Sequence, residues 1–144
     1  MKDMQTMNAT DVRKDWSTIM DSVSRKRPLF IKRTRDYMML ASKEDVSTML
    51  SYLKYQVREE VEPDGSITLT TDDMDLIVNA KTEEAAKKLM AEEISEYAEE
   101  YFDCYELYHN APNRRAHFPF VMKALIANSI EEVEEAIVCH AGKN

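Results

Sequence analysis

The stretch Asn8-Ala-Thr-Asp-Val-Arg-Lys-Asp-Trp-Ser-Thr-Ile-Met-Asp-Ser-Val23 governs how the first third of this 144-residue chain is expected to fold. Its apolar residues recur at steps of three and four, as they do on one face of a helix: Val12, Trp16, Ile19, Met20 and Val23. Asn8 or Thr10 can cap the start, because a short side-chain oxygen there accepts an unpaired backbone N–H. The stretch therefore predicts a single amphipathic helix.

The residues on both sides of this helix predict a small sheet and a second helix. Pro28 disfavours a helical conformation for the residue before it, so the first helix must end there. Two short apolar runs, residues 29–31 and 37–40, have strand length, and the charged connection between them favours a hairpin. Ser42 can cap a helix over residues 42–52, and residues 5–7 are expected to form a short strand.

This order of elements resembles the N-terminal domain of Phd/YefM-type antitoxins. The residues that carry the resemblance are the helix start Ala9-x-x-Val12-Arg13, the helix end Asp21-x-Val23, and the segments Pro28-Leu29-Phe30-Ile31-Lys32-Arg33, Met38-Met39-Leu40-Ala41 and Ser42-x-Glu44-Asp45. The resemblance implies a β-α-β-β-α domain that forms twofold homodimers and binds operator DNA, and we place it at residues 1–53. The family's usual turn glycine is absent, since Thr34-Arg35-Asp36 stands in its place.

The charge of the chain is divided unevenly between its two parts. Residues 1–52 carry ten Lys and Arg against seven Asp and Glu, whereas residues 53–144 carry nine against twenty. A basic first third on an acidic body is typical of a DNA-binding domain attached to a domain that does not bind DNA. The alternative is an uneven distribution of solvated surface charge without functional meaning.

Five basic residues of the first domain are the candidates for DNA contact: Arg13, Lys14, Lys32, Arg33 and Arg35. Arg13 and Lys14 are expected in the first turns of the helix, where backbone N–H groups also attract phosphate. An exposed guanidinium at the end of a strand, as predicted for Arg33, can reach a groove or a phosphate. The resemblance assigns operator contacts to the positions of Arg13 and Arg33. The alternative is that these cations pair with neighbouring carboxylates: Asp11, Asp15 and Asp36.

Residues 54–144 predict a second, acidic domain. Strands are expected at residues 55–61, 67–70 and 76–78, with the turn signal Pro63-Asp64-Gly65 after the first of them. Thr82 can cap a long helix that extends to Tyr108. The strand–strand–strand–helix order and the helix start Thr82-Glu-Glu-Ala-Ala resemble HicB-type antitoxins. The predicted fold class of the whole chain is α+β, with a β-β-β-α plus helices arrangement in this domain.

The last part of the chain is expected to be helical. Pro119 can open one helix, and Ser129 with Glu132 forms a capping box for the next. In that last helix the apolar residues Val133, Ala136 and Ile137 are predicted to point inward. Antitoxins of the resembling family usually end in a tail that is disordered when free, so capped helices favour rigid docking or a role in oligomerisation.

Four tyrosines recur at helical spacing on the long helix: Tyr97, Tyr101, Tyr105 and Tyr108. Such a stripe more often packs in a core or a dimer interface than it forms a site. The alternative is a toxin-binding face, because aromatic side chains are favoured anchors in interfaces. The rows of Glu in this domain are solvated helix faces in the simplest interpretation, or else they mimic RNA phosphates toward a basic toxin.

The sequence contains no pattern of an enzyme, cofactor or metal site. It has no P-loop, no glycine-rich phosphate cradle and no Ser/His/Asp order. The spacing of Cys104, His109, His117, Cys139 and His140 matches no closed zinc site, so no metal is expected and both cysteines are predicted to be reduced core residues. No apolar run is long enough for a membrane and no signal-peptide core is present, so a cytoplasmic location is expected.

Together these interpretations lead to an antitoxin of a type II toxin–antitoxin system. It would dimerise, bind operator DNA to repress its own operon, and block a small toxin that the resemblance implies is an RNase of RelE type. The alternative is a stand-alone DNA-binding transcriptional regulator whose second domain senses a ligand or assembles dimers into larger oligomers. An enzyme is disfavoured, because no residue set forms a credible catalytic site.

Overall fold

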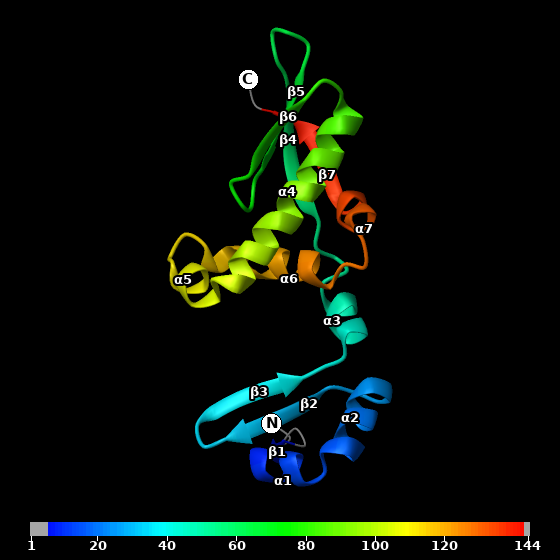
Figure 1. Cartoon of the computed structure of the whole chain (residues 1–144), viewed down its shortest axis with the longest axis vertical. Helices are drawn as coiled ribbons and strands as arrows, with labels where there is room; N and C mark the ends of the chain where they lie inside the picture. Colours follow the sequence, from blue (N-terminus) through cyan, green and yellow to red (C-terminus); the bar gives the residue numbers. More distant parts are fainter. Residues whose placement is uncertain (1–5, 143–144) are drawn as a thin grey trace. The chain divides into compact units, whose positions relative to one another are not determined.

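The computed structural model describes residues 6–142 and divides the chain into two compact units, Met1–Met49 and Leu50–Asn144. Each unit combines helices with a small sheet, which confirms the predicted α+β class (Figure 1). The division falls four residues before the predicted domain boundary at residue 53, because the helix expected to reach residue 52 ends at Met49. We call these units unit 1 and unit 2 and describe each by itself.

Unit 1 is a three-stranded sheet with short helices. Its elements, in chain order, are β1 (Met7–Asn8), α1 (Ala9–Lys14), α2 (Trp16–Arg25), β2 (Leu29–Arg33), β3 (Asp36–Leu40) and α3 (Lys43–Met49). The sheet order is β1-β2-β3, with β1 parallel and β3 antiparallel to β2. Ser42 caps α3 as predicted, because its Oγ accepts the backbone N–H of Asp45 at 3.1 Å.

The single helix predicted from Asn8 to Val23 is wrong, since the structure divides it. Asp15 separates α1 from α2 with φ −109° and ψ 29°, which lies outside the α-helical range. The apolar spacing continues across the break, so periodicity alone could not reveal it. Asn8 holds the N-cap position of α1 but makes no side-chain cap hydrogen bond. Gln5 of the predicted first strand lies outside the described residues, and β1 covers Met7–Asn8.

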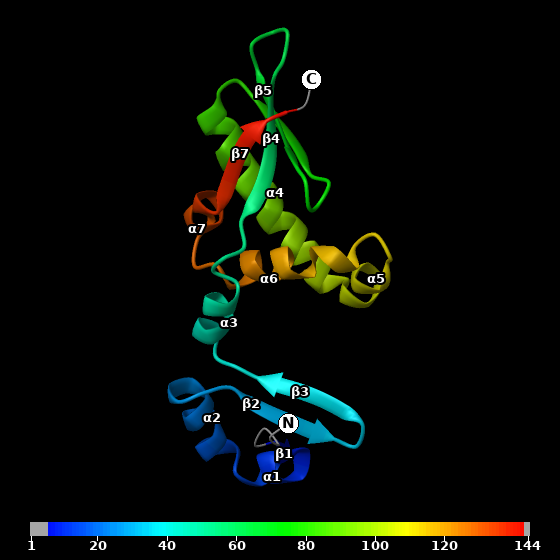
Figure 2. The same cartoon turned by 180° about the vertical axis from the view of Figure 1, so that it is seen from behind.

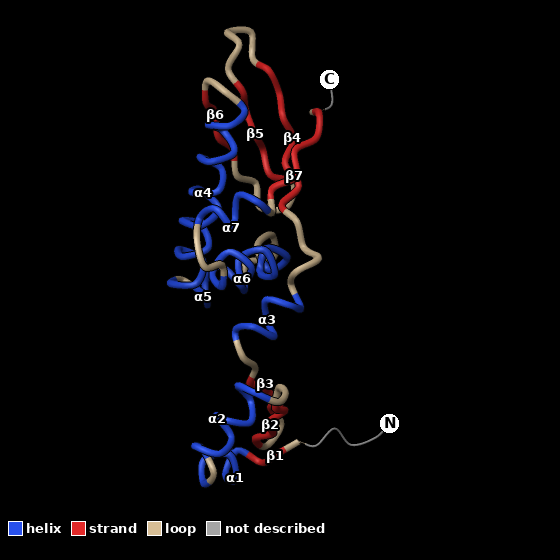
Figure 3. Tube along the Cα trace, turned by 90° about the vertical axis from the view of Figure 1, so that its right-hand side faces the viewer, coloured by secondary structure: helices blue, strands red, loops and turns tan. Residues whose placement is uncertain are grey.

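The core of unit 1 is small and one-sided. Its buried residues, followed by the partly buried ones that pack against them, are Val12, Ile19 and Val23, then Met7, Met20, Leu29, Ile31 and Leu40. Figure 3 shows α1 and α2 on one side of this sheet. A core of this size stabilises a domain only marginally. Burying more apolar surface against a partner would therefore stabilise unit 1.

The tight connection of the β2–β3 hairpin places a β-branched residue in an unfavourable conformation. Arg33 pairs with Asp36, so the connection consists of Thr34 and Arg35. Thr34 has φ 54°, in the left-handed region that suits glycine and disfavours a branched side chain. Because Thr34 stands where the family usually has a glycine, the backbone is strained at this residue.

Unit 2 is a four-stranded sheet covered on one face by helices. Its elements are β4 (Tyr55–Val61), β5 (Ile67–Thr71), β6 (Ile77–Ala80), α4 (Glu83–Asp103), α5 (Tyr105–Asn110), η1 (Arg115–His117), α6 (Phe118–Ile126), α7 (Ile130–Glu135) and β7 (Ile137–Ala141). The sheet order is β6-β5-β4-β7, in which the first three strands are antiparallel neighbours. In Figure 3 the helices lie on one side of these strands.

The last described element is a strand and not a helix, so the prediction that Ile137 lies on a helix is wrong, although Ile137 is buried as expected. α7 ends at Glu135, and β7 then runs parallel to β4, with Ile137 opposite Tyr55 (Figure 2). The Tyr55 N–H donates to the Ala136 carbonyl at 2.9 Å, and the Gly142 N–H donates to the Glu59 carbonyl at 2.9 Å. Without β7, β4 would be the edge strand of this sheet, and its backbone groups on that side would have no strand partner.

The helix predicted from Thr82 to Tyr108 begins as expected and ends earlier. Thr82 Oγ1 accepts the Ala85 N–H at 3.1 Å, which confirms the predicted cap. Cys104 then leaves the helical conformation, with φ −113° and ψ 38°, and separates α4 from α5. The Ser129 cap of α7 is also confirmed, since its Oγ accepts the Glu132 N–H at 3.2 Å.

One apolar core joins the sheet of unit 2 to its helices. Its largest fully buried side chains are Tyr55, Tyr101, Leu69, Met90, Ile94, Val57 and Val121. The Tyr55 hydroxyl donates to the Phe120 carbonyl oxygen at 2.8 Å, and burial raises the pKa of this phenol well above its usual range. Within residues 6–142, no helix has the length and apolar character needed to cross a membrane.

Candidate functional site

The five cations predicted to contact DNA all lie exposed on unit 1. Arg13 and Lys14 occupy the last turn of α1, so the expectation that they lie in the first turns of a long helix is wrong. The helix break after Lys14 is the physical reason, because it leaves α1 only six residues long. Lys32 and Arg33 end β2 as predicted, and Arg35 lies in the hairpin turn.

The parallel pairing of β1 with β2 brings these cations near one another. Asn8 lies opposite Lys32, so α1 begins beside the end of β2 that carries Arg33. Arg13 follows one helical turn after the start of α1. Topology therefore gathers residues that lie some twenty positions apart in the sequence.

None of the five cations forms an ion pair within residues 6–142. The predicted alternative, pairing with Asp11, Asp15 or Asp36, is therefore not realised within the described chain. One contact does engage a cation of this group: Lys32 Nζ lies 5.5 Å from the centre of the Tyr37 ring on the neighbouring strand. The guanidinium and ammonium groups are thus available to an external anion.

An uncovered apolar surface lies on the other face of the sheet in unit 1. Phe30 pairs with Met39 and Lys32 with Tyr37, and strand alternation directs these four residues away from the helix-covered side. Tyr37 is 70% exposed, and Phe30 and Met39 are also exposed. We call these residues the open sheet face. Three apolar side chains therefore lie on one solvent-exposed face of this sheet.

The four tyrosines of the predicted stripe pack against one another and against His109 and His117, where α4, α5 and α6 meet. Tyr101 is fully buried, and its hydroxyl donates to the Arg114 carbonyl oxygen at 3.0 Å. The Tyr108 hydroxyl donates to Glu100 at 2.9 Å, and the Arg114 guanidinium lies 4.3 Å from the centre of the Tyr108 ring. Tyr105 stacks on His109 at 4.7 Å. Contacts within unit 2 therefore engage the hydroxyl groups or rings of Tyr101, Tyr105 and Tyr108.

The surroundings of His117, Tyr97 and Tyr101 favour the neutral forms of these three side chains. Burial lowers the pKa of His117, and the Tyr97 hydroxyl lies 2.6 Å from His117 Nδ1. A neutral imidazole can accept that hydroxyl proton, which an imidazolium could not do. Burial raises the pKa of both Tyr97 and Tyr101. These shifts suit a structural cluster in which the Tyr97 hydroxyl and His117 are held together by a hydrogen bond.

Two large apolar side chains at the same corner remain exposed. Leu107 on α5 is 71% exposed, and Phe102 near the end of α4 is 56% exposed. Phe102 belongs to the apolar spacing of the predicted long helix, which did not indicate its exposure, whereas Leu107 lies off that spacing and was not selected. With the partly buried Tyr97, Tyr105 and Tyr108 they form what we call the aromatic corner.

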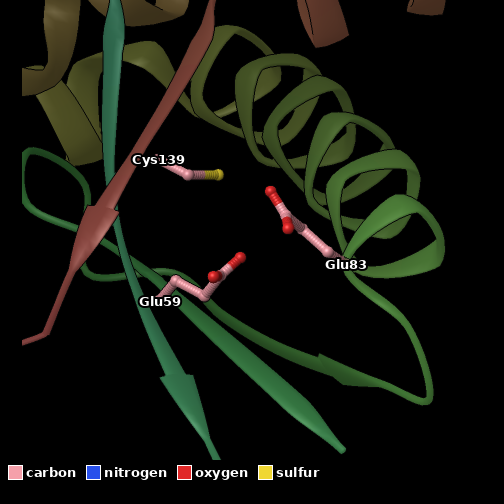
Figure 4. A group of neighbouring side chains, drawn as sticks. All are labelled: Glu59, Glu83 and Cys139. Atoms are coloured by element: carbon pink, nitrogen blue, oxygen red, sulfur yellow. The ribbon is translucent and has the colours of Figure 1, made fainter.

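The cysteines and histidines do not form the zinc set that was considered and rejected. Cys104 is exposed, so its prediction as a core residue is wrong, and Cys139 is partly buried. His140 Nε2 lies 3.0 Å from Asp72, which also binds Arg58. Among the described residues, a different group brings metal-ligating atoms within 4.8 Å of one another: Glu59, Glu83 and Cys139 (Figure 4). Burial raises the pKa of the Cys139 thiol.

Two comparisons with known proteins found matches to this chain. A family model described as "Antitoxin of toxin-antitoxin, RelE / RelB, TA system" matches residues 1–139. A crystal structure described as an antitoxin part of a proposed toxin/antitoxin system from Syntrophomonas wolfei subsp. wolfei has a TM-score of 0.92 and 35% sequence identity. The alignment covers 96% of this chain and all of that one. No curated protein matches the chain. The chain therefore belongs to this antitoxin family of toxin–antitoxin systems.

Proposed function

We propose that this antitoxin binds operator DNA as a homodimer through unit 1, represses its own operon, and blocks a small RNase toxin through unit 2. The assignment of unit 1 to the Phd/YefM subtype and of unit 2 to a HicB-like domain forms part of this proposal. The observation that carries it is the set of five exposed cations on unit 1, none of which is ion-paired within the described residues.

The charge distribution supports DNA binding by unit 1. Residues 1–49 carry ten Lys and Arg against seven Asp and Glu, and the remaining residues carry nine against twenty. Cations that are already paired would have to break those pairs before they could bind phosphate, whereas these five need not. A dimer that neutralises about four phosphates should give a slope of log K against log salt near −4.

The open sheet face supports the dimer. Among its described residues, unit 1 buries three apolar side chains, yet it exposes Phe30, Tyr37 and Met39 on one face. A second copy of the same face would cover these rings and thioethers, because a twofold axis pairs identical patches. Dimerisation also doubles the candidate cations outside the open sheet face, which are Arg13, Lys14, Arg33 and Arg35, and it suits a palindromic operator.

The DNA assignment predicts that the double variant Arg13→Ala/Arg33→Ala binds the chain's own upstream region about 100-fold more weakly at 0.1 M salt, with a much shallower salt slope. Fluorescence anisotropy with labelled upstream DNA measures both quantities. The matched control is Lys54→Ala/Lys81→Ala, which removes two exposed cations from unit 2 and should leave affinity unchanged. Equal affinity of the Arg13/Arg33 variant and the parent chain would refute the assignment.

The toxin partner that the family implies is proposed to dock on the aromatic corner of unit 2. Phe102 and Leu107 expose apolar surface there, and Tyr105 and Tyr108 contribute rings at its edge. Tyr101 is buried and supports the surface from below. An RNase toxin of RelE type would be basic, because it binds RNA, and the excess of carboxylates on unit 2 complements that charge.

The toxin assignment predicts that the product of the neighbouring reading frame co-purifies with this chain and that Leu107→Asp weakens the complex at least about tenfold. A charge at the centre of an apolar contact would be desolvated without a partner. The matched control is Val61→Asp, because Val61 is 70% exposed on the same unit and Leu107 is 71% exposed. Unchanged capture of the toxin by Leu107→Asp would place the interface elsewhere, and the absence of any small partner would favour the stand-alone regulator.

A further inference from the structure

A carboxylate occupies the helix-covered face of the sheet of unit 2, where the strand pattern calls for an apolar residue. Tyr55, Val57 and Glu59 alternate along β4, so their side chains point to the same face. Tyr55 and Val57 are buried in the core, and Glu59 follows them as a partly buried side chain. An acidic residue in this register costs stability unless something binds it.

One oxygen of this carboxylate is both buried and without a partner. Glu59 Oε1 is the single buried side-chain nitrogen or oxygen atom without a hydrogen-bond partner among residues 6–142. An unsatisfied buried acceptor destabilises the fold, and it does so more strongly when it is charged. Every other buried side-chain nitrogen or oxygen among residues 6–142 has a hydrogen-bond partner, so this oxygen is the one that a ligand would satisfy.

Two further ligand-type groups converge on the same point from separate elements. Figure 4 shows Glu83, at the start of α4, and Cys139, on β7, directed toward the Glu59 carboxylate. Their ligating atoms all lie within 4.8 Å of one another. Strand pairing and the packing of α4 bring these residues together, because they are far apart in the sequence.

We propose that Glu59, Glu83 and Cys139 bind a divalent transition-metal ion, with Zn²⁺ as the ion that best fits a thiolate and two carboxylates. Zn²⁺ accepts sulfur and oxygen ligands in tetrahedral geometry, and water would complete the fourth position. On binding, the S–H bond of Cys139 breaks, its proton passes to solvent, and a sulfur–metal bond forms.

The observed spacing requires only a modest contraction. Metal–ligand distances of about 2.0–2.3 Å in a tetrahedral site place neighbouring ligand atoms about 3.3–3.8 Å apart. Because the ligating atoms lie within 4.8 Å of one another, they need to approach by at most about 1.5 Å. Glu83 is exposed and can make that movement by rotation of its side chain. Glu83 also lines an open hollow with Glu84, Lys87 and Glu134.

The competing interpretation is that the Lys87 ammonium balances the two carboxylates without any metal. Lys87 lies close enough to influence the Cys139 thiol electrostatically, so it is a real alternative cation. A bound metal would in addition tie β4, α4 and β7 together and raise stability with metal concentration, whereas a lysine contact would not. Binding and stability measurements can therefore distinguish the two.

The test is a titration of the full chain with Co²⁺, a spectroscopic substitute for Zn²⁺, in the absence of DNA and toxin. We expect a thiolate-to-cobalt charge-transfer band in the near ultraviolet and a higher melting temperature with Zn²⁺. Cys139→Ser should remove the band and weaken metal binding by about 100-fold or more. Cys104→Ser is the matched control, because Cys104 is the other free cysteine and lies outside the cluster.

Glu59→Gln provides a second variant, because it keeps the volume of the side chain and removes the charge. It should weaken Zn²⁺ binding by at least about tenfold and leave the circular dichroism spectrum of the metal-free chain unchanged. The proposal fails if the parent chain gives no band with excess Co²⁺, or if Cys104→Ser abolishes the band and Cys139→Ser does not. It also fails if Zn²⁺ leaves the melting temperature unchanged. None of these outcomes depends on the proposed antitoxin interactions.

Discussion

Replacing Tyr101 by alanine is expected to lower the free energy of unfolding by about 3–5 kcal/mol, as for other buried aromatic residues. The Tyr101 side chain is fully buried on α4 and contacts the rings of Tyr97, Tyr105 and Tyr108. Its removal would leave a cavity at the junction of the helices and would also free the Arg114 carbonyl oxygen, to which the hydroxyl donates. Urea denaturation followed by circular dichroism measures the loss.

Two controls separate packing from hydrogen bonding and from surface effects. Tyr101→Phe keeps the ring and removes the hydroxyl, so it should cost only about 1 kcal/mol. Phe102→Ala changes the next residue of the same helix, which is 56% exposed, and should cost about 0.5 kcal/mol or less. If Tyr101→Ala were as mild as Phe102→Ala, Tyr101 would be a surface residue, and the core interpretation of the stripe would be lost.

Replacing Ile137 by aspartate is expected to destabilise unit 2 by several kcal/mol, because it introduces a charge without a partner into the core. Ile137 is 5% exposed and lies opposite Tyr55 in the parallel pairing of β7 with β4. A buried carboxylate at this point would also weaken the last strand of the sheet. The melting temperature and the urea midpoint of the full chain report the change.

The neighbouring residue supplies the matched control. Val138 is 42% exposed and points to the other face of the same strand, so Val138→Asp should cost about 0.5 kcal/mol or less. A strand predicts this strong alternation between adjacent positions. Equal effects of the two substitutions would contradict the assignment of residues 137–141 to β7.

The elements that sequence reasoning located well are those governed by local chemistry. Thr82, Ser42 and Ser129 each bond to a backbone N–H three residues later, so the helix starts could be recognised from a few neighbouring residues. The strand at residues 55–61 and the placement of Arg33 at a strand end were also found in this way. The breaks at Asp15 and Cys104 were not, because the apolar spacing continues through both.

The candidate sites divide in the same manner. The five cations could be selected from the sequence, since charge is a property of a single residue, but their exposure and their proximity follow from the fold, in particular from the pairing of β1 with β2. The burial of Tyr101 and the exposure of Leu107 depend on how α5 turns back after α4. Sequence spacing therefore identified the tyrosines, included Phe102 without indicating its exposure, and did not select Leu107.

The amino-acid sequence thus established the α+β class, the division into a basic and an acidic part, and most helix and strand positions. Three-dimensional packing established the strand β7, the open sheet face and the meeting of Glu59, Glu83 and Cys139. The physical reason is the distance along the chain between the residues that interact. Periodicity and capping act within a few residues, whereas β7 pairs with a strand about eighty residues earlier, and no local pattern records that contact.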